Sequence, residues 1–301
     1  MTASIDSFDL FNAATPRHSV FLEEIQFRAK YQRFGKAPPE LTVQKISFER
    51  DVDRYRRAAE NGNQSCFTGR RVRNPDLLQD LESIERSQRR AKTKVRLLVT
   101  ELAPNSFITF TTRKIYQLDQ FARIWEFFCS RAKVVDPQFN YVAVPEPHPS
   151  NPDHYHLHVA ARLSIPRATL RRLWHIALEA FEGRRVTATL RGSDAPGNID
   201  EQPIKGRDTL KRIRKIARYI SKYITKELIE RFNRKRYWSS KGINLAGAQV
   251  FWLTATDQGA AIREACVLLG VWDGVAPAFK AFVPSERVFW MPFDIVHEPP
   301  F

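Results

Sequence analysis

The strongest constraint in this sequence is the stretch 154–163, HYHLHVAARL, in which histidines alternate with mostly apolar residues. Side chains of a β-strand point to opposite faces in turn. His154, His156 and His158 therefore share one face, and the residues between them share the other. The stretch predicts a strand that buries one face in a core and gathers three imidazoles on the opposite face.

Short turn-rich connections around this strand predict an antiparallel sheet. The loop 147–153, PHPSNPD, joins it to a strand-like stretch at 139–146, and so short a connection forms a hairpin. We expect an α+β fold, with a central, mainly antiparallel, RRM-like sheet and helices packed on it. Residues 1–95 predict irregular structure with short helices, and 242–301 alternate aromatic-rich strand-like pieces with one helix. The individual elements expected are helices at 77–94, 117–132, 166–181, 209–232 and 257–270, strands at 95–101, 107–113 and 185–191, and a loop at 192–208.

Positive charge is concentrated in one part of the chain. The 301 residues carry a formal net charge of +15, with a pI near 10.0. Residues 205–241 hold 14 Lys and Arg against 3 Asp and Glu, so this block supplies +11. Such a block favours a polyanionic partner, either nucleic acid or an anionic membrane surface. A solvated helix face is the alternative.

The histidine face has the composition of a divalent-metal site. Histidines two residues apart on a strand lie about 6.6 Å apart, so His156 and His158 can approach one ion. If 141–146 pairs with 154–160, Glu146 reaches the same face. Two neutral imidazoles and a carboxylate suit Mg²⁺ or Mn²⁺. A His-rich surface strand without a metal is the alternative, because short motifs often match by chance.

The helix expected at 209–232 separates an apolar stripe from a stripe of tyrosines and cations. At about 100° per residue, Tyr219 and Tyr223 fall about 40° apart, beside the stripe of isoleucines. The cations near them are Arg212, Lys215, Lys222 and Lys226. Cations favour a phenolate and hold phosphate, so we expect a lowered tyrosine pKa and attack on a phosphodiester. Tyrosines that flank a core stripe, with their hydroxyls in water, are the alternative.

Three motifs in this order resemble those of the HUH endonucleases, and more narrowly the rolling-circle replication initiators of small phages and plasmids. FITFTTR at 107–113 resembles the first motif of that family, and HLHVA at 156–160 resembles the second. YISKYITK at 219–226 resembles the third, in the two-tyrosine form of the phage gene A type. The resemblance implies a division into an N-terminal extension at 1–94, an HUH endonuclease domain at 95–243 and a C-terminal extension at 244–301.

The resemblance also implies a chemistry. The metal would polarise the scissile phosphate, and a tyrosine would attack the phosphorus of single-stranded DNA. The products would be a 5′-phosphotyrosine link and a free 3′-OH, and the reverse reaction would rejoin the ends. The implied metal ligands are His156, His158 and Glu146, with His154 a weaker candidate, and the implied catalytic residues are Tyr219, Tyr223, Lys222 and Lys226.

Further DNA contacts are expected in the basic block. Cations bind phosphates in a salt-dependent manner, and aromatic rings among them suit stacking of unpaired bases. A core position is the alternative for Trp238. The expected DNA-binding residues are Arg212, Lys215, Arg234, Lys235, Arg236, Tyr237, Trp238 and Lys241.

Other functions fit the same features. A transposase or mobilisation relaxase of the same superfamily would share the chemistry, whereas a non-catalytic nucleic-acid-binding protein would bind DNA without forming a covalent product. The expected partners are single-stranded DNA and an origin duplex or hairpin. Because no GxxxxGK[ST] loop is present, a host helicase and polymerase are expected as well.

Cysteine usage and hydropathy predict the compartment. Cys66, Cys129 and Cys266 lie far apart and form no CxxC pair, which indicates a reducing environment. The sequence shows neither a secretory signal nor an apolar stretch long enough to span a membrane. We expect location in the cytoplasm of a bacterial host, without membrane attachment.

Overall fold

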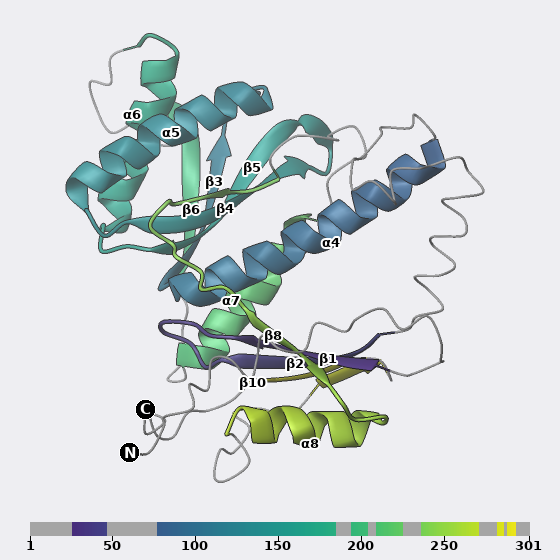
Figure 1. Ribbon diagram of the computed structural model, residues 1–301. Helices are drawn as coiled ribbons and strands as arrows, with labels where there is room; N and C mark the ends of the chain where they lie inside the picture. Colours follow the sequence, from purple (N-terminus) through teal and green to yellow (C-terminus); the bar gives the residue numbers. More distant parts are fainter. Residues whose placement is uncertain are drawn as a thin grey trace. The chain divides into compact units, whose positions relative to one another are not determined.

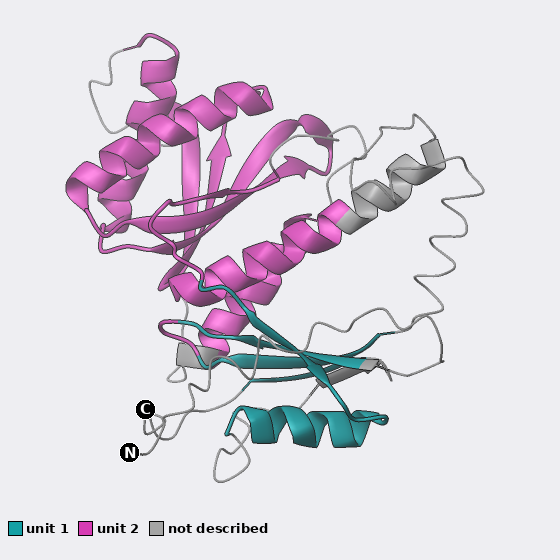
Figure 2. Ribbon diagram, viewed as in Figure 1, with its two compact units in different colours: residues 1–34, 38–74, 246–301 teal, residues 35–37, 75–245 magenta. Residues whose placement is uncertain are grey.

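The computed structural model describes residues 26–46, 77–184, 194–203, 209–224, 236–270, 282–285 and 288–292. The chain divides into two compact units (Figure 2). We call residues 35–37 and 75–245 the central unit, and residues 1–34, 38–74 and 246–301 the terminal unit. Each unit contains an antiparallel sheet with helices packed on it, which confirms the α+β fold class. The three-part division of the sequence stays a prediction.

The central unit is built on a sheet with strand order β6-β3-β5-β4-β7 (Figure 1). These strands are β3 (Ser106–Thr112), β4 (Asn140–His148), β5 (Asn151–Arg162), β6 (Gly197–Pro203) and β7 (Trp238–Ser239). The histidine strand is β5, and it lies in the middle of the sheet. The predicted hairpin of β4 and β5 is present, with a shorter turn than expected because pairing continues to His148 and Asn151.

Helices cover both faces of this sheet (Figure 1). On one face lie α5 (Leu118–Val135) and α6 (Arg167–Phe181), packed on an aromatic-rich core. On the other lie α4 (Leu77–Leu102) and α7 (Thr209–Tyr223). The strand residues alternate between the two cores, as the period of a strand requires. Ile108, Phe110, Leu157 and Val159 face α5 and α6, whereas Phe107, Val142, Val144 and Ala160 face α4 and α7.

The segment 95–101 is helical, so the predicted strand there is wrong. Its valines and leucines favour a strand locally. The buried side chains, however, recur at the helical spacing of three and four residues. They are Val95, Leu98, Val99 and Leu102, which pack in the same core as Ile216 and Ile220 of α7. The helix ends at Leu102, where Ala103 takes a positive φ of 48° before Pro104.

Other sequence predictions also need correction. Irregular structure before residue 95 is wrong, because β1 (Gln26–Gln32) and β2 (Glu40–Ile46) are strands. The loop expected at 192–208 contains β6, which pairs with β3. Both misses concern strands defined by partners distant in sequence, which leave little local pattern. The strand expected at 185–191 and the end of the 209–232 helix lie outside the described residues.

The terminal unit joins segments from both ends of the chain in one sheet, of order β8-β1-β2-β10-β9. Its further elements are β8 (Gln249–Leu253), α8 (Gln258–Leu268), β9 (Phe282–Ser285) and β10 (Val288–Pro292). Helix α8 packs on one face of this sheet and begins at Asp257, whose carboxylate accepts the Ala260 N–H. Among the helices that the structure describes, none is long and apolar enough to cross a membrane.

Phe128 tests the aromatic core on the α5 side of the central sheet. It is fully buried and contacts the rings of Phe110 and Trp174. Phe128→Ala should lower the free energy of unfolding by about 3–5 kcal/mol, measured by urea denaturation. The control is Phe127→Ala, on the exposed side of the same helix, which should change it by about 0.5 kcal/mol or less. Equal losses for both variants would contradict this packing.

Candidate active site

The three histidines of β5 lie on the face of the central sheet that α4 and α7 cover. Tyr155 and Leu157, between them, are buried against the opposite core with α5 and α6. His158 is buried, whereas His154 and His156 are half-buried. The alternation read from the sequence therefore places the imidazoles on one side.

Glu146 and His158 form a buried pair. Glu146 lies on β4 directly opposite His156, on the same face of the sheet. Its carboxylate Oε2 is 2.6 Å from Nε2 of His158. The Nδ1 atom of the same ring is 3.2 Å from the hydroxyl of Thr109 on β3. The imidazole is thus held from both neighbouring strands, which fixes its orientation.

Helix α7 brings the two tyrosines to these histidines. Its apolar stripe is buried against the sheet and α4. The Tyr223 ring stacks on His158, with centroids 3.8 Å apart and planes within 14°. Tyr219 meets Tyr223 edge to face at 5.3 Å and Phe107 at 5.2 Å. Four rings, from β3, β5 and α7, therefore form one cluster, which we call the ring cluster: Phe107, His158, Tyr219 and Tyr223.

The two tyrosines differ in access to solvent. The Tyr219 residue is 44% exposed, whereas Tyr223 is 7% exposed. Burial raises the pKa of the Tyr223 phenol, and its hydrogen bond to Tyr219 raises it further. The sequence prediction of a lowered pKa is therefore wrong for Tyr223, because desolvation of the phenolate outweighs the nearby cations. Tyr219 presents its side chain to solvent, and Tyr223 lies behind it.

A second histidine group lies at the turn of the β4–β5 hairpin. The ring of His156 is 4.9 Å from that of His148 and 5.9 Å from that of His154. Burial and the neighbouring imidazoles lower the pKa of His156, so its ring is neutral at pH 7, as a metal ligand must be. The Nε2 atom of His154 contacts the carbonyl oxygen of Thr112 at 2.8 Å.

The predicted metal ligands share a face but do not form a closed coordination group. Within the described ranges, no three His, Cys, Asp or Glu side chains converge as a metal-binding set. Glu146 and His158 bond to each other, and His156 faces His148 and His154. In chemical type, two imidazoles and a carboxylate on one sheet face fit a divalent cation.

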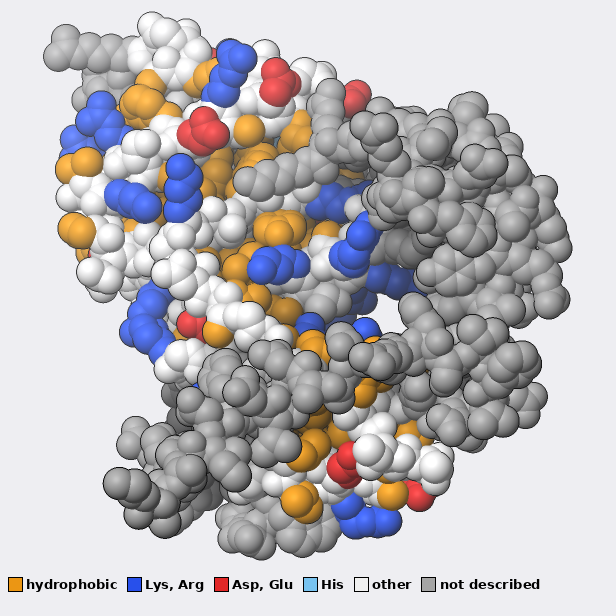
Figure 3. Space-filling view, viewed as in Figure 1, with side chains coloured by type: hydrophobic (Ala, Val, Ile, Leu, Met, Phe, Trp, Pro, Cys, Tyr) orange, Lys and Arg blue, Asp and Glu red, His pale blue; other side chains and the backbone are white. Residues whose placement is uncertain are grey.

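The predicted cations fall in several places. Lys215 and Lys222 are exposed on α7, and Arg212 is half-buried there. Figure 3 shows Lys and Arg side chains beside hydrophobic ones across the middle of the viewed face. Three of the predicted cations lie outside the described residues: Lys226, Arg234 and Lys235.

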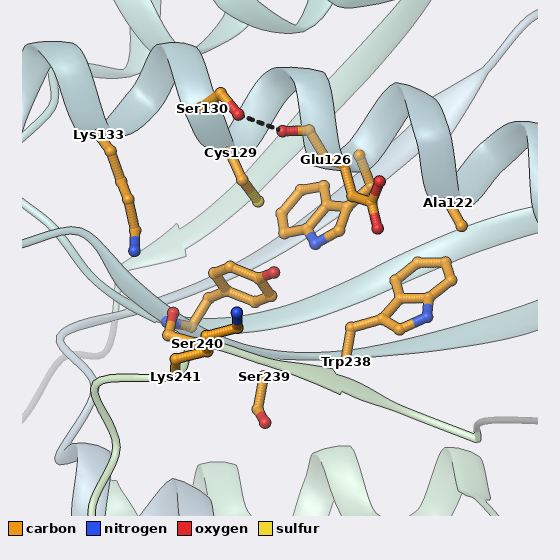
Figure 4. A pocket seen from close by; sticks show the side chains of 11 residues that line it. Ala122, Glu126, Cys129, Ser130, Lys133, Trp238, Ser239, Ser240 and Lys241 are labelled. Atoms are coloured by element: carbon orange, nitrogen blue, oxygen red, sulfur yellow. Dashed lines mark hydrogen bonds between the residues drawn. The ribbon is translucent and has the colours of Figure 1, made fainter.

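The segment after the basic block crosses the edge of the central sheet at β7. Arg236 is buried, and Tyr237 packs against the core on the α7 side, where burial raises the pKa of its phenol. Trp238 packs on the α5 side, with its ring 6.4 Å from that of Phe121. Beside it is a hollow of about 320 Å³ between α5 and β7, lined by residues that include Lys133 and Lys241 (Figure 4).

The sequence analysis missed two members of the site. Phe107 contributes to the ring cluster, and Thr109 contacts His158. Both lie in the FITFTTR stretch, two residues apart on the face that α7 covers. Applying the strand period to that stretch would have placed them beside the histidines.

Comparison with known proteins covers part of the chain. Residues 105–228 match the model of a family described as replication-associated protein, of the ORF2 and gene II protein type. This range contains β3 to β6 and the described part of α7, and therefore the whole ring cluster. No curated protein and no solved structure matches the chain.

Tetranitromethane, which nitrates accessible tyrosines, tests the placement of the two phenols. Tyr219 should be modified first because it is exposed, and Tyr223 should be protected by its stack on His158. Mass spectrometry of peptides from a time course gives both rates, with the buried Tyr116 as the protected reference. Equal rates at Tyr219 and Tyr223 would show that the ring cluster is not formed as described.

Proposed function

Because residues 105–228 belong to this replication-associated family of rolling-circle replication initiators, of the HUH endonuclease type, we propose that this chain nicks single-stranded DNA at a replication origin. The reaction is a transesterification in which a tyrosine of α7 becomes linked to the 5′-phosphate. The observation that carries the proposal is the contact of the tyrosine helix with the histidine strand: Tyr223 stacks on His158, and Tyr219 stands exposed beside it.

Tyr219 is the nucleophile of the first cut. Its hydroxyl oxygen attacks the phosphorus, a new P–O bond forms, and the bond from phosphorus to the 3′ oxygen breaks. The phenol proton passes to solvent, which Tyr219 reaches, and the departing 3′ oxygen takes up a proton. The phosphodiester is exchanged for a phosphotyrosine, so the reaction is reversible and can rejoin the ends. Tyr223, which is buried, can act only after the ring cluster opens.

The surrounding cations hold the strand and offset the charge of the attacked phosphate. Lys222 lies one turn after Tyr219 and is exposed on the same helix, where its ammonium can reach a phosphate oxygen near that phenol. Lys215 and Arg212 extend the positive charge along α7. Lys226 has the same spacing from Tyr223 as Lys222 has from Tyr219, and we assign it the same role.

The acceptor face of β4 and β5 would hold the divalent cation. His156, His158 and Glu146 are the residues we assign to Mg²⁺ or Mn²⁺. When bound, the ion supplies Lewis-acid polarisation of the scissile phosphate. The chain contributes the orientation of the ligands: Thr109 holds one nitrogen of His158, and the β4–β5 pairing sets Glu146 opposite His156.

The two tyrosines should behave differently in a covalent-adduct assay. Labelled single-stranded origin DNA and Mn²⁺ are incubated with each variant and resolved on a denaturing gel. Tyr219→Phe should reduce first-cut adduct by about 100-fold or more, which equals about 2.7 kcal/mol of transition-state stabilisation or more. Tyr223→Phe should retain the adduct within about threefold and lose transfer to a second strand.

Tyr31→Phe, a tyrosine change in the terminal unit, is the control and should leave the adduct unchanged. Loss of the first adduct in Tyr223→Phe but not in Tyr219→Phe would reverse our assignment. Salt-dependent DNA binding with no adduct from the unmodified protein would instead support a non-catalytic nucleic-acid-binding protein.

The ligand assignment has its own test. His156→Ala should reduce cleavage by about 100-fold or more, because Lewis-acid activation contributes several kcal/mol, and should leave DNA binding nearly unchanged. His154→Ala, on the same face of the same strand, is the matched variant and should cleave normally. Cleavage that continues in excess EDTA, or that is lost only in His154→Ala, would refute the assigned ligand set.

A further inference from the structure

The terminal unit carries a sheet face that the proposed function does not use. Its sheet lies outside residues 105–228 and combines β1 and β2 with β8, β9 and β10. The alternate residues of these strands face α8 and form the core of this unit. That core includes Phe27, Ala29, Leu41, Val43, Phe251, Leu253 and Phe289 from the strands, and Ala261 and Ala265 from α8. The remaining residues of each strand point to the opposite face.

Strand register places the side chains of that opposite face in rows. One row runs Trp252, Arg28, Gln44, Val288, and the next runs Val250, Lys30, Thr42, Trp290. Neighbouring strands lie about 4.8 Å apart, so each cation stands next to an apolar or aromatic side chain. We call Arg28, Lys30, Val250, Trp252 and Trp290 the aromatic–basic face.

This face is accessible to a ligand. The Trp252 residue is 36% exposed and Val250 is 52% exposed, although both are hydrophobic. Arg28 and Lys30 are half-buried beside them. Large apolar side chains left exposed on an ordered sheet indicate a binding surface.

The charge of the face selects the partner. Among the described strands of this sheet, the one acidic residue is Glu40, which is buried and accepts a hydrogen bond from the Trp290 indole at 3.3 Å. Two cations therefore face solvent with no exposed acid beside them on these strands. Arg28 is oriented by its hydrogen bond to Gln44. Positive charge next to flat indole rings complements a chain of phosphates that also offers unpaired bases.

We propose that the aromatic–basic face binds single-stranded DNA, with a base stacked on Trp252 and phosphates held by Arg28 and Lys30. This is a second DNA contact, separate from the ring cluster and beyond the nicking function proposed above. Duplex DNA fits the face less well, because its bases are stacked on one another and offer no free ring face. The two chain ends, to which the sequence assigns no role, would then form a DNA-holding surface.

Binding is measured in the Tyr219→Phe/Tyr223→Phe variant, so that no covalent adduct forms. Fluorescence anisotropy with a labelled single strand of about 30 nucleotides, long enough for two contacts, gives the affinity. Trp252→Ala should weaken binding by about 5- to 100-fold, the range that one lost base stack produces. Trp252→Phe retains a ring and should recover most of the affinity. The control is Leu268→Ala, an exposed position on α8 of the same unit, which should change nothing.

The cations are tested by the salt dependence of the same binding. Arg28→Ala/Lys30→Ala should lower the slope of log K against log salt by about 1.4, since each phosphate contact to a single strand contributes about 0.7. Arg263→Ala, an exposed cation on α8, is the charge-matched control. Unchanged affinity in a folded Trp252→Ala protein, or an equal loss on duplex and single strand, would overturn the proposal.

These outcomes are independent of the proposed function. Adduct formation by the unmodified protein on a short origin oligonucleotide reports on nicking alone. If that adduct is absent while Trp252→Ala weakens binding, the nicking proposal fails and the surface stands. If the adduct forms and Trp252→Ala has no effect, the surface fails and the nicking proposal stands.

Discussion

The stack of Tyr223 on His158 is the contact on which the arrangement of the site depends. At 3.8 Å between ring centroids, it joins the central strand of a sheet to a helix more than sixty residues later in the chain. The imidazole cannot turn away, because Glu146 and Thr109 hold its two nitrogens. The phenol cannot turn away either, because Ile220 and Ile224 on either side are buried in the core. The stack therefore sets where Tyr219, one turn earlier, meets solvent.

Local periodicity predicts the parts of this site that depend on a single element. The alternation in β5 and the isoleucine stripe of α7 could be read from the sequence, because each follows the geometry of its own backbone. The helical state of 95–101 could not, since Val95 and Leu97 favour a strand and the preceding helix decides the outcome. Strands β1, β2 and β6 are defined by partners far along the chain, so their own residues carry little signal.

Counting cations around a helix does not predict the electrostatics of a phenol. Sequence reasoning set four cations near two tyrosines and expected both phenolates to be favoured. The structure separates the two side chains, because a rotation of about 40° between them moves one from the surface into the core. Burial then raises the pKa of Tyr223, and the desolvation of its phenolate dominates over charges that remain in water. Depth below the surface, which no wheel projection contains, makes the two residues unequal.

The two sheets follow the same strand period and reach opposite results. In the central sheet both faces are covered by helices, so a polar group such as Glu146 is retained only by pairing with His158. In the terminal sheet α8 covers one face, and the other keeps cations and indole rings in contact with solvent. A buried polar face can orient reacting groups because its side chains have fixed partners. An open aromatic face can instead bind a flexible strand, because stacking on an indole requires no particular base.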